Sequence, residues 1–186
     1  MPETTPLRLI LESRRSIRKF LPRPVEREKI ESCLDAARLA PSAENAQGCR
    51  YLVIDDPDFK NRFAGKVFSG IYAPTRFAAE APVLVLLLAK TSFIAHRAGQ
   101  AVQGIPFQAL DAGIAGEHFV LQAEELGLAT CWIGWFDVRA ARRFFKIPRR
   151  YRILSLISLG YAARRPPNER VRKPIAEIAW WNRFEG

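Results

Sequence analysis

The sequence predicts a single domain in which helices and a small number of strands are interspersed. Three observations predict it. The chain has 186 residues, the length of one ordinary domain, and no internal repeat or clean boundary divides it. Hydrophobic residues make up 48% of the chain, enough for a substantial core. Neither G-x-G-x-x-G after the first strand nor G-x-x-x-x-G-K-[ST] occurs, so the Rossmann fingerprint and the P-loop are both excluded.

The first half of the chain carries the signals of three helices and two strands. Helical spacing or composition predicts helices over residues 6–13, 25–39 and 58–68. Pro22 and Pro24 separate the first two, and Pro41 ends the second because a residue before proline avoids the helical region. We expect strands over residues 50–55 and 82–89, and the second is almost uninterrupted Val and Leu, as in a strand buried on both faces. Residues 71–80 fit neither pattern clearly.

The second half begins with a polar, irregular stretch over residues 91–106, a mobile loop or lid in our interpretation, with 91–104 as the candidate for a small lid. Residues 107–126 form a long helix that is apolar most of the way round, which indicates a buried central helix or a subunit interface. Gly113 and Gly116 would let another backbone approach it, and Gly127 would cap it. We then expect a strand over 129–134, a basic helix over 138–146, a strand over 152–161, a segment rich in Pro and Arg over 162–174, and an aromatic tail over 175–184.

The net charge is +10, from 29 basic and 19 acidic residues, and much of the excess lies between residues 139 and 152. Arg139, Arg142, Arg143 and Lys146 share one face of the expected helix, with Phe144 and Phe145 turned elsewhere. This face is either simply solvated or attracts an anion: a nucleic acid, a membrane surface or a phosphate-bearing cosubstrate.

Membrane and metal-binding classes are not expected. No apolar run reaches the length of a membrane span, the longest being 81–89, and the first residues lack the layout of a signal peptide, so we expect a cytoplasmic protein. Cys33, Cys49 and Cys131 are far apart, no C-x-x-C pair exists, and there are two histidines, so we expect no metal site and free, buried thiols.

Two short stretches are candidates for binding. Residues 14–20 place four cations and Ser16 around two apolar anchors, Ile17 and Phe20. Arginine forks match phosphate oxygens, so this stretch is suited to a compact anion, although a solvated basic face gives the same pattern. Residues 41–49 are rich in neutral donors and acceptors, which suit the edge of a heterocycle, or form an ordinary turn.

Three stretches, in order, resemble motifs of the nitroreductase family of flavin enzymes. Arg14 to Phe20 is similar to its R-x-S-x-R/K-x-F, and Ala40 to Gln47 to its A-P-S-x-x-N-x-Q. Residues 126–134 and 159–161 are similar to its G-L-G/A-T-x-W-I-G followed by L-G-Y. One departure is Gly48-Cys49, where the family commonly has Pro-Trp after the glutamine.

The resemblance implies a fold and an assembly. It implies an α+β fold with a central, mostly antiparallel sheet flanked by helices. It also implies an intertwined homodimer with two FMN molecules in clefts between the subunits. Residues 1–186 would form one domain, with 162–186 an arm that packs on the partner subunit.

The resemblance also implies roles for particular residues. Arg14, Arg15 and Ser16 would hold the FMN phosphate, a late basic pair of Arg170 and Arg172 would close that site, and Arg18 would reach the flavin pyrimidine. The second motif would come from the partner subunit through Pro41, Ser42, Ala43, Asn45 and Gln47. Trp132, Ile133 and Gly134 would lie along the ring near its reactive nitrogen. No catalytic acid or base is expected, because the flavin carries the hydride chemistry.

The expected function is therefore an FMN-dependent oxidoreductase. It would take a hydride from NADH or NADPH and reduce a flat small-molecule acceptor such as a nitroaromatic or a quinone. The surplus arginines mildly favour NADPH. Alternatives are another flavin reaction on the same scaffold (dehalogenation, heterocycle oxidation or flavin breakdown) and, as a distant second class, a basic protein that binds nucleic acid or another anion.

Overall fold

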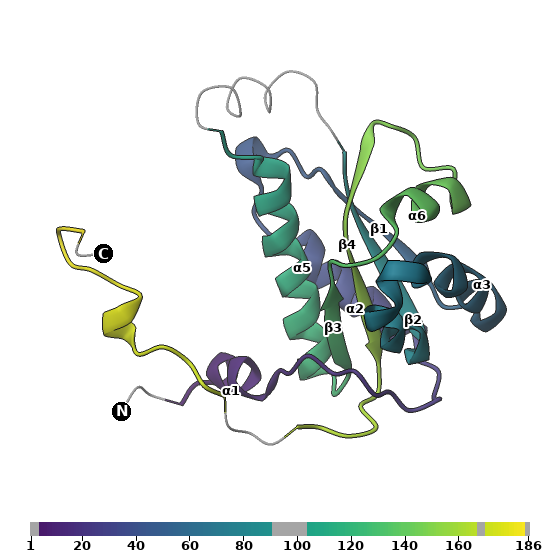
Figure 1. The fold of residues 1–186 in the computed structure, drawn as a ribbon. Helices are drawn as coiled ribbons and strands as arrows, with labels where there is room; N and C mark the ends of the chain where they lie inside the picture. The colour runs from purple at the N-terminus through teal and green to yellow at the C-terminus, as the bar shows by residue number, and fades with distance from the viewer. Residues whose placement is uncertain (1–3, 91–103, 167–169, 185–186) are drawn as a thin grey trace.

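The domain is built on one four-stranded antiparallel sheet with helices on both faces (Figure 1). The computed structural model describes residues 4–90, 104–166 and 170–184. In these the sheet has the order β1-β2-β4-β3, formed by β1 (Cys49–Ile54), β2 (Val83–Lys90), β4 (Tyr151–Gly160) and β3 (Ala129–Ile133). The expected antiparallel sheet flanked by helices is confirmed.

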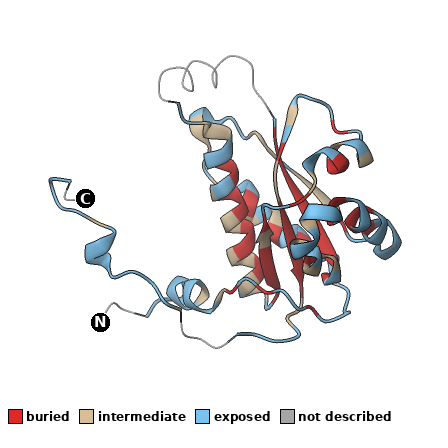
Figure 2. Ribbon diagram, in the orientation of Figure 1, coloured by how far each residue is buried: buried red, intermediate tan, exposed pale blue. Residues whose placement is uncertain are grey.

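Strand β2 lies inside the sheet between β1 and β4, and every residue from Val83 to Ala89 is buried. Its unbroken Val and Leu run is explained by the helices that cover both faces, because neither side of the strand meets water (Figure 2). The β2–β4 register shifts between Leu87 and Leu88, a local bulge in the ladder.

Helices α2 (Arg27–Arg38) and α5 (Phe107–Glu125) cover one face of the sheet. Ile30, Cys33 and Ala37 of α2 pack with Phe119, Val120 and Ala123 of α5 and with the strand residues Val83, Val85 and Ile157. Helix α5 is therefore the buried central helix that the sequence indicated. It still leaves Leu110 and Gly113 exposed on the side away from this core.

The other face is covered by α3 (Pro57–Val67), α6 (Val138–Phe144) and η2 (Gly70–Glu80). Phe63 packs against Phe144 and Phe145, with ring centroids 5.5 and 5.0 Å apart. The ambiguous stretch 71–80 is thus part of a 3₁₀ segment. Its end is held by the buried Lys60, whose Nζ donates to the carbonyls of Ala79 at 2.6 Å and Ala81 at 2.8 Å.

The expected basic helix over 138–146 is shorter than predicted, and its single cationic face is wrong. Helix α6 ends at Phe144, and Lys146 lies beyond it with φ of 51°. Arg142 turns inward, and its guanidinium donates to the carbonyls of Ile147, Pro148 and Tyr151 at 2.8–3.0 Å. Arg142 therefore holds the turn between α6 and β4, and of the four cations Arg139, Arg143 and Lys146 remain exposed.

The segment that follows the first helix is bonded to β3 and to the residue after β4. After α1 (Pro6–Ser13), the backbone of Ile17 donates to the carbonyl of Thr130 at 2.9 Å, and that of Leu21 donates to Tyr161 at 2.8 Å. The C-terminal arm, residues 170–184 with η3 (Ile175–Glu177), passes α1 and extends away from the domain (Figure 1). That it packs on a partner subunit stays a prediction.

Three further expectations concern the cysteines, the lid and membrane-spanning helices. Cys33, Cys49 and Cys131 are free thiols, as expected, but Cys49 is only half-buried. The lid expected over residues 91–104 lies almost wholly outside the described residues. Among the helices that the structure describes, none has the length and apolar character needed to cross a bilayer.

Candidate cofactor site

The first motif is fixed in place by the edge strand β3. Ser16 forms a parallel bridge with Thr130, so the segment after α1 adds to the edge of the sheet. Ile17 (1% exposed) and Phe20 (7%) anchor this segment in the core. Alternation along the extended backbone then leaves the side chains of Ser16 and Arg18 exposed. The apolar anchors of the motif thus decide where its polar groups point.

Glu117 in the middle of α5 joins the first and third motifs. The indole Nε1 of Trp132 donates to Oε2 of Glu117 at 3.3 Å, and Oε1 of the same carboxylate lies 4.0 Å from Nε of Arg14. Burial raises the pKa of the neighbouring Cys131 thiol, while the charges of Arg18 and Arg14 lower it. The predicted residues of these two motifs therefore lie along β3.

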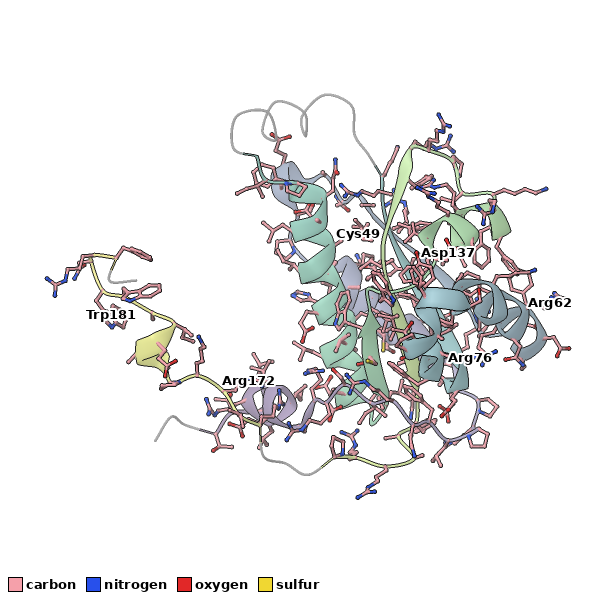
Figure 3. All side chains as sticks on the ribbon, in the orientation of Figure 1. Cys49, Arg62, Arg76, Asp137, Arg172 and Trp181 are labelled. Carbon is pink, nitrogen blue, oxygen red and sulfur yellow. The ribbon has the colours of Figure 1, made fainter. Side chains whose placement is uncertain are left out.

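Arg170 brings the C-terminal arm to the same place. Its Nη2 donates to the carbonyls of Leu11 and Glu12, each at 2.6 Å, at the C-terminal end of α1. Its pKa is lowered by burial first and then by the charges of Arg15, Arg14 and Arg172. The expected late basic pair thus lies with the early one. Figure 3 shows Arg172 beside α1, where Arg170 and Arg172 border an open cavity of about 640 Å³.

The second motif lies elsewhere on the same chain. The backbone N–H of Ala43 donates to Oδ1 of Asp111 at 3.0 Å, near the start of α5, and that of Gln47 donates to Oγ of Ser42 at 2.9 Å. Asp111 and Glu117 are six residues apart, which places them about a third of a turn apart around the helix axis. Glu44, Asn45 and Gln47 all have φ near +50° (54°, 51° and 46°), a strained conformation for residues other than glycine.

The structure thus divides the predicted residues into two groups. The first group lies along β3 and beside α1 and comprises Arg14, Arg15, Ser16, Arg18, Trp132, Ile133, Gly134, Arg170 and Arg172. The second group lies on the loop at the start of α5 and comprises Pro41, Ser42, Ala43, Asn45 and Gln47. Within the first group Ile133 as a whole residue is 1% exposed and is enclosed by its own chain, whereas Gly134 is exposed with open space beside it.

Several residues of this region were not predicted from the sequence. Asp111 and Glu117 are acidic residues in a helix that otherwise reads as apolar, and that contrast was the available signal. From η2, the Phe77 ring centroid lies 5.6 Å from the guanidinium carbon of Arg18. Thr75 Oγ1 donates at 2.6 Å to the carbonyl of Trp135, directly after Gly134. Nothing in the local pattern of residues 71–80 predicted these contacts.

Comparison with known proteins places this geometry in a family. A sequence model described as the nitroreductase family matches residues 11–161. A protein of Methanothermobacter thermautotrophicus, provisionally named NADH dehydrogenase/NAD(P)H nitroreductase, is 31% identical over 161 residues, which cover 84% of this chain and 77% of its own length.

Solved structures of nitroreductases superpose on this chain. A nitroreductase family protein of Clostridium difficile 630 superposes with a TM-score of 0.77 at 28% identity, over 94% of this chain and 97% of its own. An FMN-dependent nitroreductase of Clostridium difficile R20291 superposes with a TM-score of 0.75 at 28% identity, over 94% and 98%. The resemblance expected from the three motifs is confirmed, and this chain belongs to the nitroreductase family.

Proposed function

We propose that this protein is an FMN-dependent oxidoreductase that takes a hydride from NADH or NADPH and reduces a flat acceptor such as a nitroaromatic or a quinone. Membership of the nitroreductase family supports it. So do the names of similar proteins, which include an FMN reductase [NAD(P)H] of Bacillus subtilis that is 29% identical over 134 residues, 67% of this chain and 52% of its own.

The observation that carries the proposal is the convergence of four arginines from the two ends of the chain. Arg15 is 8% exposed and the Arg14 side chain 18%, so both cations are largely removed from water. Burial lowers the pKa of Arg170, and the nearby charges of Arg15, Arg14 and Arg172 lower it further. Crowded, partly buried cations disfavour one another, and a phosphate dianion would relieve that repulsion and accept their hydrogen bonds. The residues present therefore fit the phosphate of FMN.

The groups around the end of β3 fit the rest of the cofactor. Trp132 offers an apolar surface, Gly134 offers an exposed backbone, and Arg18 would place a positive charge at the pyrimidine edge of the ring. When bound, FMN supplies the hydride transfer in both half-reactions. The role of the chain is to hold the phosphate, orient the ring and set the charge beside it, and no side chain is assigned as an acid or base.

We further propose that the working unit is a homodimer in which the second group of residues comes from the partner. In one chain the loop 41–47 is held at the start of α5, apart from the arginines. The arm exposes Ile175, Trp181 and Phe184 by 73–82%, and α5 exposes Leu110 by 53%. Figure 3 shows Trp181 on the part of the arm that extends away from the domain. Apolar exposure of this extent is typical of a surface that binds another chain. A cytoplasmic location stays a prediction.

The visible spectrum of the purified protein tests the proposal. A yellow protein with an oxidised-flavin spectrum is expected, and anaerobic addition of NADH or NADPH should bleach it at different rates. Addition of a nitroaromatic or a quinone should then restore the colour. Protein that is colourless and stays so after FMN is added contradicts the proposal.

A further inference from the structure

A second cavity lies behind the loop of the second motif, on the side of the sheet that α2 and α5 cover. It has a volume of about 230 Å³. Leu34, Ala37 and Arg38 of α2 line one wall, Asp111 and Ala115 of α5 another, and Cys49 and Tyr51 of β1 its floor. Each set shares one face of its element, because helix positions three or four apart and strand positions two apart point the same way. Figure 3 shows Cys49 between α5 and the sheet.

Three of the polar residues that line this cavity, Asp111, Tyr51 and Cys49, lie on α5 and β1; the lining also includes Arg38, Ser42, Gln47 and Arg50. Asp111 is 5% exposed, and one of its oxygens accepts the N–H of Ala43. The hydroxyl of Tyr51 is buried and has no hydrogen-bond partner among the described residues. The Cys49 thiol lies near both, since Asp111 raises the pKa of Cys49 and Cys49 raises that of Tyr51, after burial as the main cause in each. A buried hydroxyl without a partner is costly, so the lining of this cavity presents an unused donor as well as a buried carboxylate.

The loop that closes this cavity is strained. Pro41, Ser42 and Gln47 line the cavity, and three non-glycine residues between 44 and 47 have positive φ. Such strain persists where surrounding structure holds it, and it is concentrated at sites that bind ligands. An apolar pocket with a small number of convergent polar groups is the usual form of a small-molecule site.

We propose that this cavity is a second binding site, separate from the phosphate cluster, for a small planar ring that carries a primary carboxamide. The amide N–H₂ would donate to the carboxylate of Asp111. The amide carbonyl would accept from the hydroxyl of Tyr51. The ring would lie against Leu34, Ala37 and Ala115. A single substituted six-membered ring is of the size that the cavity admits, whereas a whole dinucleotide or flavin is too large. Because Ser42 and Gln47 close the cavity, a bound ring would also fix the loop 41–47.

Benzamide and benzoate are the probes that test this pairing on the whole protein as purified. They share the ring, but benzoate has no N–H to donate and repels Asp111. The two arginines on the lining are already bonded, Arg38 to Asp35 and Arg50 to the carbonyls of Gln47 and Cys49. Calorimetric titration is expected to detect benzamide binding and at least tenfold weaker binding of benzoate. Equal affinity for benzamide and benzoate, or no detectable binding of benzamide, would overturn the proposal. The flavin spectrum is recorded on the same sample, so failure of the proposed function is seen separately.

Three variants locate the site. Tyr51→Phe removes one oxygen and keeps the ring contact with Phe119 (6.4 Å), and it should weaken benzamide binding about tenfold. In Asp111→Asn the side-chain oxygen can still accept the N–H of Ala43, but the NH₂ group then faces the amide N–H₂ of benzamide. Two donors cannot pair, so this variant should abolish benzamide binding. Ala115→Leu fills the cavity and should do the same. Tyr151→Phe is the matched control, since Tyr151 packs in the core on the other face of the sheet. Benzamide affinity unchanged in Tyr51→Phe and Asp111→Asn would refute the assignment.

Discussion

The indole nitrogen of Trp132 donates to the carboxylate of Glu117 at 3.3 Å, and Gly116 leaves room for the Trp132 ring against α5. A methyl group at position 116 would come within 2.7 Å of Cζ2 of Trp132 and closer still to its Cη2. Trp132 is thus held by a hydrogen bond on its edge and by a close backbone approach on the helix. This pair of contacts sets where the third motif lies relative to Arg14.

Gly116→Ala should therefore displace the indole. We expect the free energy of unfolding to fall by about 1–3 kcal/mol and flavin content to drop, because an added methyl in a packed interior forces neighbours to move. Chemical denaturation and the visible spectrum measure the two effects. Gly65→Ala in α3 is the control, since nothing lies within 4 Å of the added Cβ, and it should stabilise by about 0.5–1 kcal/mol. Equal changes in the free energy of unfolding and in flavin content for Gly116→Ala and Gly65→Ala would contradict the close contact between Gly116 and Trp132.

Arg142 holds the turn between α6 and β4 through three carbonyl groups. Arg142→Ala leaves these carbonyls without their donor, so we expect a loss of about 1–3 kcal/mol in the free energy of unfolding. The neighbouring Arg143 is exposed, and Arg143→Ala should change it by no more than about 0.5 kcal/mol. Urea denaturation measures the free energy of unfolding of both variants. Similar losses in the two would mean that the hydrogen bonds of Arg142 to the turn do not stabilise the fold.

Tyr161 of the L-G-Y motif is hydrogen-bonded to two charged side chains at the start of α2. Its hydroxyl donates to Oε2 of Glu26 at 2.5 Å and accepts from Nζ of Lys29 at 2.9 Å. The hydrogen bond from Tyr161 is the main cause that lowers the pKa of Glu26 from 4.5 to about 2, and Tyr161 raises the pKa of Lys29. A carboxyl with a lowered pKa stabilises the fold above its unfolded pKa and loses that contribution as pH falls.

Tyr161→Phe should accordingly be less stable than the unmodified protein near neutral pH. The difference should shrink as pH falls from 4.5 toward 2 and the carboxyl takes up its proton. It should also shrink at high pH, once Lys29 loses its charge above its ordinary pKa. Thermal unfolding across pH measures this difference, and one that stays constant with pH would contradict the linkage.

The homodimer can be tested on the exposed face of α5. Gly113 is exposed and has open space beside it in one chain, so Gly113→Arg is compatible with a folded monomer. If this face meets the partner, the variant should shift toward the monomer in sedimentation velocity, and Gly65→Arg, at an exposed position of α3, should not. Unmodified protein that sediments as a monomer would exclude the shared site.

The sequence predicted the elements better than the links between them. The Val and Leu run of β2 and the spacing of α2 follow from local periodicity, and both were found where expected. The bond from Arg170 to the end of α1 joins residues 159 positions apart. Only the similarity of Arg170 and Arg172 to a family motif predicted their place, because no local pattern reports such a distance.

Other features could not be predicted because tertiary contacts decide them. Arg142 reads as one more cation on a helix face, yet the carbonyls of the following turn draw it inward. The segment 70–80 has no clear period, and Lys60 and Trp135 fix it from outside. The strain at Glu44, Asn45 and Gln47 likewise depends on Asp111, which holds the loop from another element.

The central claim is that arginines from the two ends of the chain grip the phosphate of FMN. Comparing the dissociation constants of FMN and riboflavin tests it most directly, because the two differ only in that phosphate. FMN should bind about a hundredfold more tightly, as two or more charge-assisted hydrogen bonds would give. In Arg14→Ala/Arg170→Ala that preference should be largely lost while riboflavin affinity is kept, and in Arg143→Ala it should persist. Equal affinity for FMN and riboflavin in the unmodified protein, or an undiminished preference in the double variant, would contradict the account.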